Sequence, residues 1–343
     1  MRTRRIAQKI RPLILLGAAV VLCAFGPKRA QDPATDSASA PTSATHVFST
    51  GDALQARDEA ALTRWCADLD DSVKKLGWNL PPCDWKRWRL GGESVQGRPL
   101  VYAEFGNPQA RSSNTSLVLA MVHPDEITPL YLALQLAQWM GDHPKDLTDA
   151  HVIIAPLVNP DGFYRPVRTR TNAHGVDLNR NFGTDDWSHE ALQRWRRMFG
   201  ANPRRFPGRQ PNSEPETRFQ LKLLEEMQPR KVLSVHSPLN FLDYDGPMTI
   251  TLKRFPTEYV HRCLELRTRL QAKHEGFFPG SLGNYAGQER GIPTFTLELP
   301  TANAGSARTY WEQFSQGIRT MIQFEVPAYV FREPGSGDSS TLN

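Results

Sequence analysis

Six apolar residues, Leu117-Val118-Leu119-Ala120-Met121-Val122, lead directly into the polar sequence His123-Pro124-Asp125-Glu126. An apolar run of this length is typical of a strand that is buried on both faces of a sheet. A histidine and a carboxylate three positions apart, placed where such a strand ends, can bind the same metal ion. A distant histidine, His236 in Ser234-Val235-His236-Ser237, can complete a set of three ligands. Three protein ligands leave one coordination position open, which is typical of a hydrolytic zinc site.

Short apolar segments alternate with longer amphipathic segments on both sides of this peptide. The predicted strands are 100–105, 117–122, 150–158, 231–235 and 294–298, and the predicted helices are 129–140, 216–227, 258–274 and 310–324. This alternation predicts an α/β fold with a mixed, mostly parallel central sheet flanked by helices. Ligands in such folds gather at the carboxyl ends of the strands, so we expect His123, Asn159 and His236 to meet at one edge of the sheet.

The N-terminus has the features of an export signal. The first thirty residues carry seven arginines and lysines and no acid, and the apolar stretch 13–26 is short for a permanent membrane anchor. The whole chain has a formal charge of +5 and this leader has +7, so the rest of the chain has a charge of −2. The basic charge therefore does not indicate nucleic-acid binding. We expect an exported protein, located in the periplasm of a Gram-negative type of envelope, with no stable membrane insertion after leader removal.

The composition predicts five segments in the chain. They are a secretory leader over 1–30, a disordered linker over 31–49, a small N-terminal helical appendage over 50–85, a catalytic domain over 86–328 and a C-terminal tail over 329–343. The helical appendage either packs on the main domain or covers its cleft. Cys66 and Cys83 lie within it, and in an oxidising compartment they either pair or remain two separate buried thiols.

Further polar motifs follow the other predicted strands. They are Asn159-Pro160-Asp161-Gly162, Asp177-Leu178-Asn179-Arg180-Asn181 and Thr296-Leu297-Glu298-Leu299. A carboxylate inside an apolar strand, as at Glu298, is costly unless it is paired or functional. With the His123-x-x-Glu126 and His236-Ser237 pairs and the peptide 94–100, this ordered set resembles the zinc metallocarboxypeptidases over about residues 88–325.

The resemblance implies a carboxypeptidase-like fold and one zinc ion, bound by His123, Glu126 and His236. It implies that Glu298 is the general base, which takes a proton from the attacking water and passes it to the leaving amine.

The resemblance also implies a set of cationic and polar groups around the scissile bond. Arg170 would stabilise the oxyanion, with Arg168 as the nearby alternative. Asn179 and Arg180 would bind the terminal carboxylate of the substrate, for which a guanidinium is well shaped.

Two departures separate the chain from the digestive carboxypeptidases. Those enzymes carry an arginine before the glutamate ligand, where this chain has Asp125, and a mobile tyrosine in the region that here has the sequence 275–279. The segments 213–218, 279–285 and 291–293 instead resemble the bacterial murein peptide amidases and related γ-D-glutamyl-meso-diaminopimelate peptidases. This similarity implies a peptidoglycan-derived peptide as the substrate.

Diaminopimelate carries an extra zwitterionic end, so its pocket needs both an acid and hydrogen-bond donors. Asp125 is either the acid of that pocket or a partner of a zinc ligand. Ser281 and the neighbouring glycines would line the pocket.

Other functions stay open at this point. A general zinc carboxypeptidase and an acyl-amino-acid deacylase are alternatives on the same scaffold, and a cell-wall peptide-binding protein without turnover is an alternative of another class. The sequence makes no prediction of the oligomeric state. Six further histidines lack a partner at ligand spacing and are not expected to bind metal; they are His143, His151, His174, His189, His261 and His274.

Overall fold

A computed structural model describes residues 50–112, 114–246, 269–272 and 278–325. The predicted leader, linker and C-terminal tail lie outside these residues. Among the described helices, none is both long enough and apolar enough to cross a membrane.

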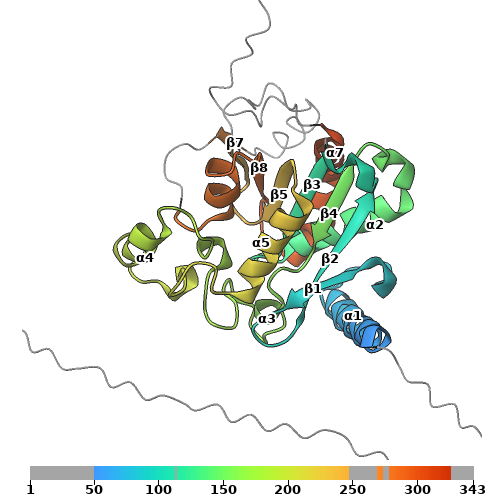
Figure 1. The fold of residues 1–343 in the computed structure, drawn as a ribbon, viewed down its shortest axis with the longest axis horizontal. Coiled ribbons are helices and arrows are strands. Elements are labelled where there is room, and N and C mark those ends of the chain that lie inside the picture. The colour runs from blue at the N-terminus through green and yellow to red at the C-terminus, as the bar shows by residue number, and fades with distance from the viewer. Residues whose placement is uncertain (1–49, 113, 247–268, 273–277, 326–343) are drawn as a thin grey trace, which may run out of the picture. The chain divides into compact units, whose positions relative to one another are not determined.

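One mixed sheet of eight described strands forms the centre of the fold, in the order β1-β2-β4-β3-β5-β8-β6-β7 (Figure 1). Its strands are β1 (Arg89–Glu93), β2 (Pro99–Gly106), β3 (Thr115–Ala120), β4 (His151–Ala155), β5 (Lys231–His236), β6 (Phe241–Asp245), β7 (Arg269–Ala272) and β8 (Thr294–Glu298). The four central strands β4, β3, β5 and β8 are parallel, whereas β2 and β6 run antiparallel to their inner neighbours. The predicted α/β fold with a mixed, mostly parallel sheet is confirmed.

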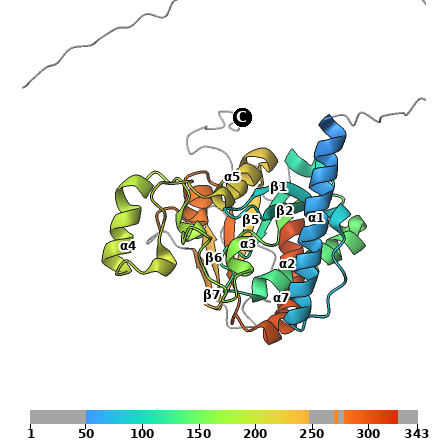
Figure 2. The same cartoon turned by 90° about the horizontal axis from the view of Figure 1, so that it is seen from below.

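The described α-helices are α1 (Thr50–Lys75), α2 (Thr128–Asp142), α3 (Pro160–Phe163), α4 (Leu192–Met198), α5 (Pro215–Met227) and α7 (Ala307–Gln323). Four of them, α1, α2, α5 and α7, cover the two faces of the sheet. The apolar sides of α1, α2 and α7 form one core with the sheet, and Figure 2 shows these three helices together on one side. The apolar side of α5 belongs to a second core on the opposite face.

Alternation along the strands decides which face the polar residues of the site occupy. In β3, Val118 and Ala120 belong to the core under α2, and Leu117 and Leu119 belong to the core under α5. Because successive side chains of a strand point to opposite faces, the same rule applies to β5, β6 and β8. Their residues Leu233, Leu242 and Leu297 face α2 and α7, so His236, Phe241 and Glu298 lie on the α5 face.

The prediction of a helix over 258–274 is wrong for Arg269–Ala272, which form strand β7 beside β6. The rest of that range lies outside the described residues. Pairing with an edge strand satisfies the backbone N–H and C=O groups, and such tertiary pairing can override a local helical pattern. The peptide 94–100, which belongs to the motifs of the family resemblance, lies before and at the start of β2. It forms the turn of a hairpin between β1 and β2, where Ser94 N–H donates to the Arg98 carbonyl at 2.8 Å and Gly97 has a φ of +73°.

The first helix packs on the domain on the side away from the α5 face. Its apolar residues Leu62, Trp65, Leu69 and Val73 recur at helical spacing and are buried in the core shared with α2 and α7. The ring of Trp65 meets that of Trp88 edge-on, with 5.1 Å between ring centroids. A helix docked in this way contributes to the core and does not cover the α5 face, on which His236 and Glu298 lie.

A disulfide bond joins Cys66 in α1 to Cys83, which lies just before the first strand. Of the two alternatives left by the sequence, the structure shows the pair. The bond closes a loop of 17 residues and fixes the end of α1 to the segment that leads into the sheet.

We expect the double substitution Cys66→Ala/Cys83→Ala to lower the free energy of unfolding by about 2–4 kcal/mol, because the cross-link restricts the unfolded chain. Urea titration followed by tryptophan fluorescence measures the effect. The wild type in reductant serves as the matched control and should approach the stability of the variant. Equal midpoints for the wild type with and without reductant would contradict the prediction.

Candidate active site

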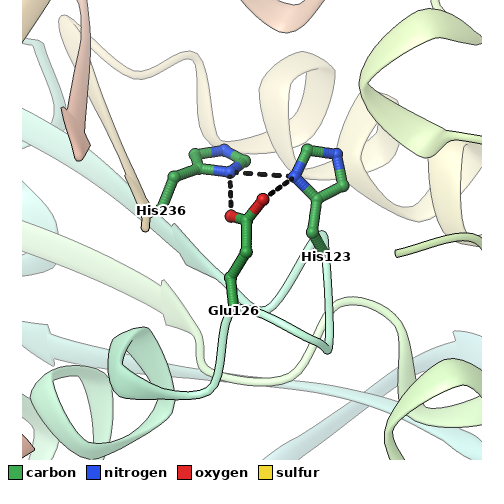
Figure 3. Close-up of side chains that lie close together, drawn as sticks. All are labelled: His123, Glu126 and His236. Carbon is green, nitrogen blue, oxygen red and sulfur yellow. Dashed lines mark hydrogen bonds and ion pairs between the residues drawn. The ribbon is translucent and has the colours of Figure 1, made fainter. Parts of the chain in front are cut away.

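Two histidines and a glutamate converge on one point at the carboxyl ends of β3 and β5 (Figure 3). His123 Nδ1 lies 3.0 Å from Glu126 Oε1 and 3.1 Å from His236 Nδ1. His236 Nδ1 lies 2.9 Å from Glu126 Oε2. All three side chains are buried. The sequence prediction that these residues come together agrees with this geometry.

The geometry of this cluster fits a zinc ion. Ligand atoms in a tetrahedral zinc shell lie ~3.3 Å from one another, since each is ~2.0–2.1 Å from the metal. The three separations between Glu126, His123 and His236 are close to that value. Nitrogen and carboxylate oxygen are also the donor types that zinc takes in hydrolytic sites. Burial alone would raise the pKa of Glu126, but His123 and His236 lower it below its usual value, so the carboxylate is ionised.

Short local structures place the three ligands. His123 and Glu126 share a tight turn after β3, in which Glu126 N–H donates to the His123 carbonyl at 3.0 Å. His236 is the last residue of β5, and its Cα partner in the neighbouring strand β8 is Glu298. The ends of β5 and β8 therefore place the ligand His236 beside the carboxylate residue Glu298.

Asp177 is a hydrogen-bond partner of the ligand His123, a role that the sequence analysis did not assign. It is fully buried, and its Oδ1 lies 3.0 Å from His123 Nε2. An ionised carboxylate accepts only, so Nε2 carries the hydrogen and the lone pair of Nδ1 faces the metal position. Burial would raise the pKa of Asp177, but Arg170 and His123 lower it well below its usual value. Ser234 makes a similar contact with His236 Nε2, at 2.9 Å.

Glu298 lies beside this cluster. Its side chain is buried, and the N–H of Leu239 approaches its Oε2 at 3.4 Å. Burial raises the pKa of Glu298, and the neighbouring Glu126 carboxylate adds to the increase. A carboxylate with a raised pKa is a stronger proton acceptor, as a general base near neutral pH requires.

The structure distinguishes the two candidate oxyanion arginines by position. Arg170 lines the cleft, donating from Nε to Asp177 at 2.8 Å and from Nη1 to Glu126 at 3.0 Å. Arg168 instead stacks over the ring of Phe163, 4.9 Å from its centroid. The geometry therefore favours Arg170.

Asn179 and Arg180, which the resemblance assigns to carboxylate binding, both line the cleft. Asn179 Oδ1 accepts from the N–H of Leu282 at 2.8 Å, which leaves its amide nitrogen as the donor. Arg180 stacks over Phe278, 4.2 Å from the ring centroid. Burial lowers the pKa of Arg180 to about 10, and the nearby Asp177 opposes the shift.

Ser281 lines the cleft, as the sequence analysis expected of a pocket residue. Asp125 is not among the lining residues; it forms an ion pair with Arg204, which does line the cleft. The carboxylate of Asp125 is thus bound to a cation, and the Nε2 atoms of His123 and His236 contact Asp177 and Ser234 instead. Neither of the two roles considered for Asp125 accounts for this contact.

The cleft has a volume of about 540 Å³ and carries charges of both signs. Four arginines line it: Arg170, Arg180, Arg204 and Arg205. Two acids of β6, Asp243 and Asp245, lie along the wall beyond Glu298. The sequence analysis missed both acids, although their alternation in Phe241-Leu242-Asp243-Tyr244-Asp245 is the pattern of a strand with one polar face.

The other described histidines lie away from this cluster. His151 binds Glu104, His174 binds Glu214, and His143 contacts the Trp139 carbonyl. His189 is exposed, and His261 and His274 lie outside the described residues. The one cluster of three potential ligands found in the described part of the chain is His123, Glu126 and His236.

We expect Asp177→Asn to weaken zinc binding by about 10–100-fold, because a neutral amide replaces the charge that orients His123 and Arg170. Competition with a chelator of known zinc affinity measures the change. Asp142→Asn, at an exposed carboxylate that ends α2, is the control and should bind zinc like the wild type. An unchanged affinity in Asp177→Asn would show that this carboxylate does not support the metal site.

Several known proteins are similar to this chain. Murein peptide amidase A from Escherichia coli (strain K12) is 32% identical over 223 residues, which are 63% of this chain and 82% of the relative. The protein of the same name from Vibrio campbellii is 31% identical over 215 residues, covering 62% and 79%. Carboxypeptidase SOL1 from Arabidopsis thaliana is 36% identical over 100 residues, which are 26% of this chain and 20% of that protein.

Solved structures agree with the fold. The murein-tripeptide amidase MpaA from Escherichia coli O157 matches with a TM-score of 0.50 and 23% identity, covering 70% of this chain and 93% of that one. Carboxypeptidase A from Helicoverpa armigera matches with a TM-score of 0.56 and 20% identity, covering 69% and 68%. The sequence model of the zinc carboxypeptidase family matches residues 87–336, which are most of the chain. Together with the ligand cluster, this match identifies the chain as a member of the zinc carboxypeptidase family and as a zinc metallopeptidase.

Proposed function

We propose that this chain hydrolyses the amide bond between γ-D-glutamate and meso-diaminopimelate in peptides derived from peptidoglycan. The observation that carries the proposal is a hydrolytic cleft lined by charges of both signs. The relatives named murein peptide amidase A support a cell-wall peptide as the substrate.

The charges of the cleft fit the product side of this bond. Diaminopimelate has a carboxylate near the scissile nitrogen and a second ammonium and carboxylate at the far end of a short carbon chain. Asn179 and Arg180 offer donors for the nearer carboxylate. Asp243 lies two residues beyond Phe241, the Cα partner of Glu298, which is ~7 Å along the strand. An acidic wall at that distance favours a substrate with a distal ammonium over one with an apolar side chain.

Each residue of the site has a role in this reaction. A zinc ion held by His123, Glu126 and His236 would make water more acidic and polarise the scissile carbonyl. Glu298 accepts a proton from the attacking water on its carboxylate and returns it to the leaving nitrogen. Arg170 uses two of its N–H groups on Asp177 and Glu126, and its remaining donors face the developing oxyanion.

Export to the periplasm is part of the proposal. The basic, apolar leader supports it, as does the bond between Cys66 and Cys83, because structural disulfides persist in oxidising compartments.

We expect the purified protein to release diaminopimelate from L-Ala-γ-D-Glu-meso-diaminopimelate, with a kcat/KM at least about 100-fold above that for N-acylated C-terminal dipeptides. Mass spectrometry of the products identifies the bond that is cut. Robust dipeptide cleavage without diaminopimelate release would favour a general carboxypeptidase or a deacylase. Tight binding of the tripeptide without any turnover would favour a binding protein.

We expect Glu298→Gln to lower kcat by about 100- to 10,000-fold while the protein keeps its zinc, because the amide cannot accept the proton of water. Kinetics on the same tripeptide and elemental analysis of the purified variant give the two readouts. Glu312→Gln, at an exposed carboxylate of α7, is the control. Wild-type activity in Glu298→Gln would remove this residue from the mechanism.

A further inference from the structure

We propose that Arg204, held in place by Asp125, binds the free α-carboxylate of the γ-D-glutamyl residue on the acyl side of the scissile bond. This assignment rests on the proposed function and goes beyond it, because it names the group that selects a γ-linked substrate.

The Asp125–Arg204 pair joins the metal site to a distant segment. Asp125 lies between the ligands His123 and Glu126, and Arg204 lies 79 positions along the chain in the short helix Pro203–Arg205. Arg204 Nη1 donates to Asp125 Oδ2. Among the described residues, Asp125 forms the ion pair with this guanidinium.

The two members of the pair differ in what they present to a ligand. The side chain of Arg204 is 58% exposed and lines the cleft, whereas that of Asp125 is 21% exposed. The second carboxylate oxygen, Asp125 Oδ1, is buried and has no hydrogen-bond partner among the described residues. The arginine therefore faces the substrate, and the acid faces the protein.

Neighbouring residues place this guanidinium on the acyl side. Asp125 precedes Glu126, whose Oε1 accepts from Arg170, the arginine assigned to the oxyanion. The groups assigned to the leaving residue, Arg180 and Asp243, come from other elements, the short helix Leu178–Arg180 and β6. The pair with Asp125 holds Arg204 at the turn that carries His123 and Glu126, and the proposal places it on the side of the cleft where the substrate carbonyl and the residue that carries it would lie.

A γ-linked D-glutamyl residue has an anion at this side that an ordinary peptide lacks. Its chain continues through the side-chain carboxyl group, so the α-carboxylate remains free, a few carbons from the scissile carbonyl. In an α-linked peptide the α-carboxyl group itself forms the scissile amide, so no free α-carboxylate remains. A guanidinium can bind a carboxylate through two parallel N–H groups. Arg204 uses Nη1 for Asp125, and its other N–H groups remain as donors for a substrate carboxylate. Because Asp125 fixes the orientation of Arg204, less side-chain entropy is lost when the substrate binds.

The experiment compares two tripeptides that differ only at this group. One is L-Ala-γ-D-Glu-meso-diaminopimelate, and the other carries a carboxamide in place of the glutamyl α-carboxylate. We expect the wild type to prefer the carboxylate by about 10–100-fold in kcat/KM, the range of a charge-assisted hydrogen bond. Arg204→Gln should lose this preference, because the substitution slows cleavage of the carboxylate peptide far more than cleavage of the amidated peptide. Arg204→Lys should keep part of the preference.

Two further variants separate recognition from a structural effect. Asp125→Asn should raise KM for the carboxylate peptide more than KM for the amidated peptide, because it loosens Arg204 without removing it. Arg197→Gln, at an exposed arginine that ends α4, is the matched control and should keep the full preference.

The outcomes are distinguishable. Equal losses on both peptides in Arg204→Gln, or a wild type that does not discriminate between them, would overturn the assignment of Arg204 and leave the proposed function intact. A wild type that cleaves neither peptide would refute the proposed function and the assignment with it.

Discussion

The buried carboxylate of Asp177 is the contact on which the rest of the site depends. An ionised carboxylate taken fully out of water costs several kcal/mol unless cations and N–H groups bind it. Asp177 meets Arg170 at 2.8 Å, His123 at 3.0 Å and the N–H of Asn179 at 3.1 Å. One side chain thus fixes the tautomer of His123, the position of Arg170 and the start of the segment that carries Asn179 and Arg180.

The sheet supplies the second constraint. His236, Glu298 and Phe241 occupy one row across β5, β8 and β6, because His236 pairs with Glu298 and Glu298 pairs with Phe241. A shift of one residue in either register would turn Glu298 into the core under α2 and α7. The apolar residues Leu297 and Leu242 exclude that shift, since they would then face the cleft. The hydrophobic core therefore sets the distance between base and metal ligands.

The sequence was sufficient to predict the elements with strong local patterns. The apolar run before His123 and the isolated acid at Glu298 identified β3, β8 and the polar edge that they share. The fold of β7 was not predictable in this way, because its strand depends on pairing with β6. The partner of Asp125 was not predictable either. Arg204 lies 79 positions away, and nothing local to either residue indicates that they meet.

The cleft holds its arginines in two different ways, and the difference bears on selectivity. Arg180 is buried, which lowers its pKa to about 10, and it rests on the face of Phe278. The charge of a bound carboxylate would offset the desolvation cost of this buried cation, so the burial of Arg180 favours anionic ligands.

Arg204 is exposed, and an exposed ion pair stabilises a protein by only about 0–1 kcal/mol. The contact with Asp125 therefore adds little to the stability of the protein. Its effect is to orient Arg204, because a long side chain that is already held loses less conformational freedom when a ligand binds. In the proposed reaction zinc and Glu298 would supply the chemistry of hydrolysis, and the placement of these two arginines would determine which carboxylates the cleft accepts.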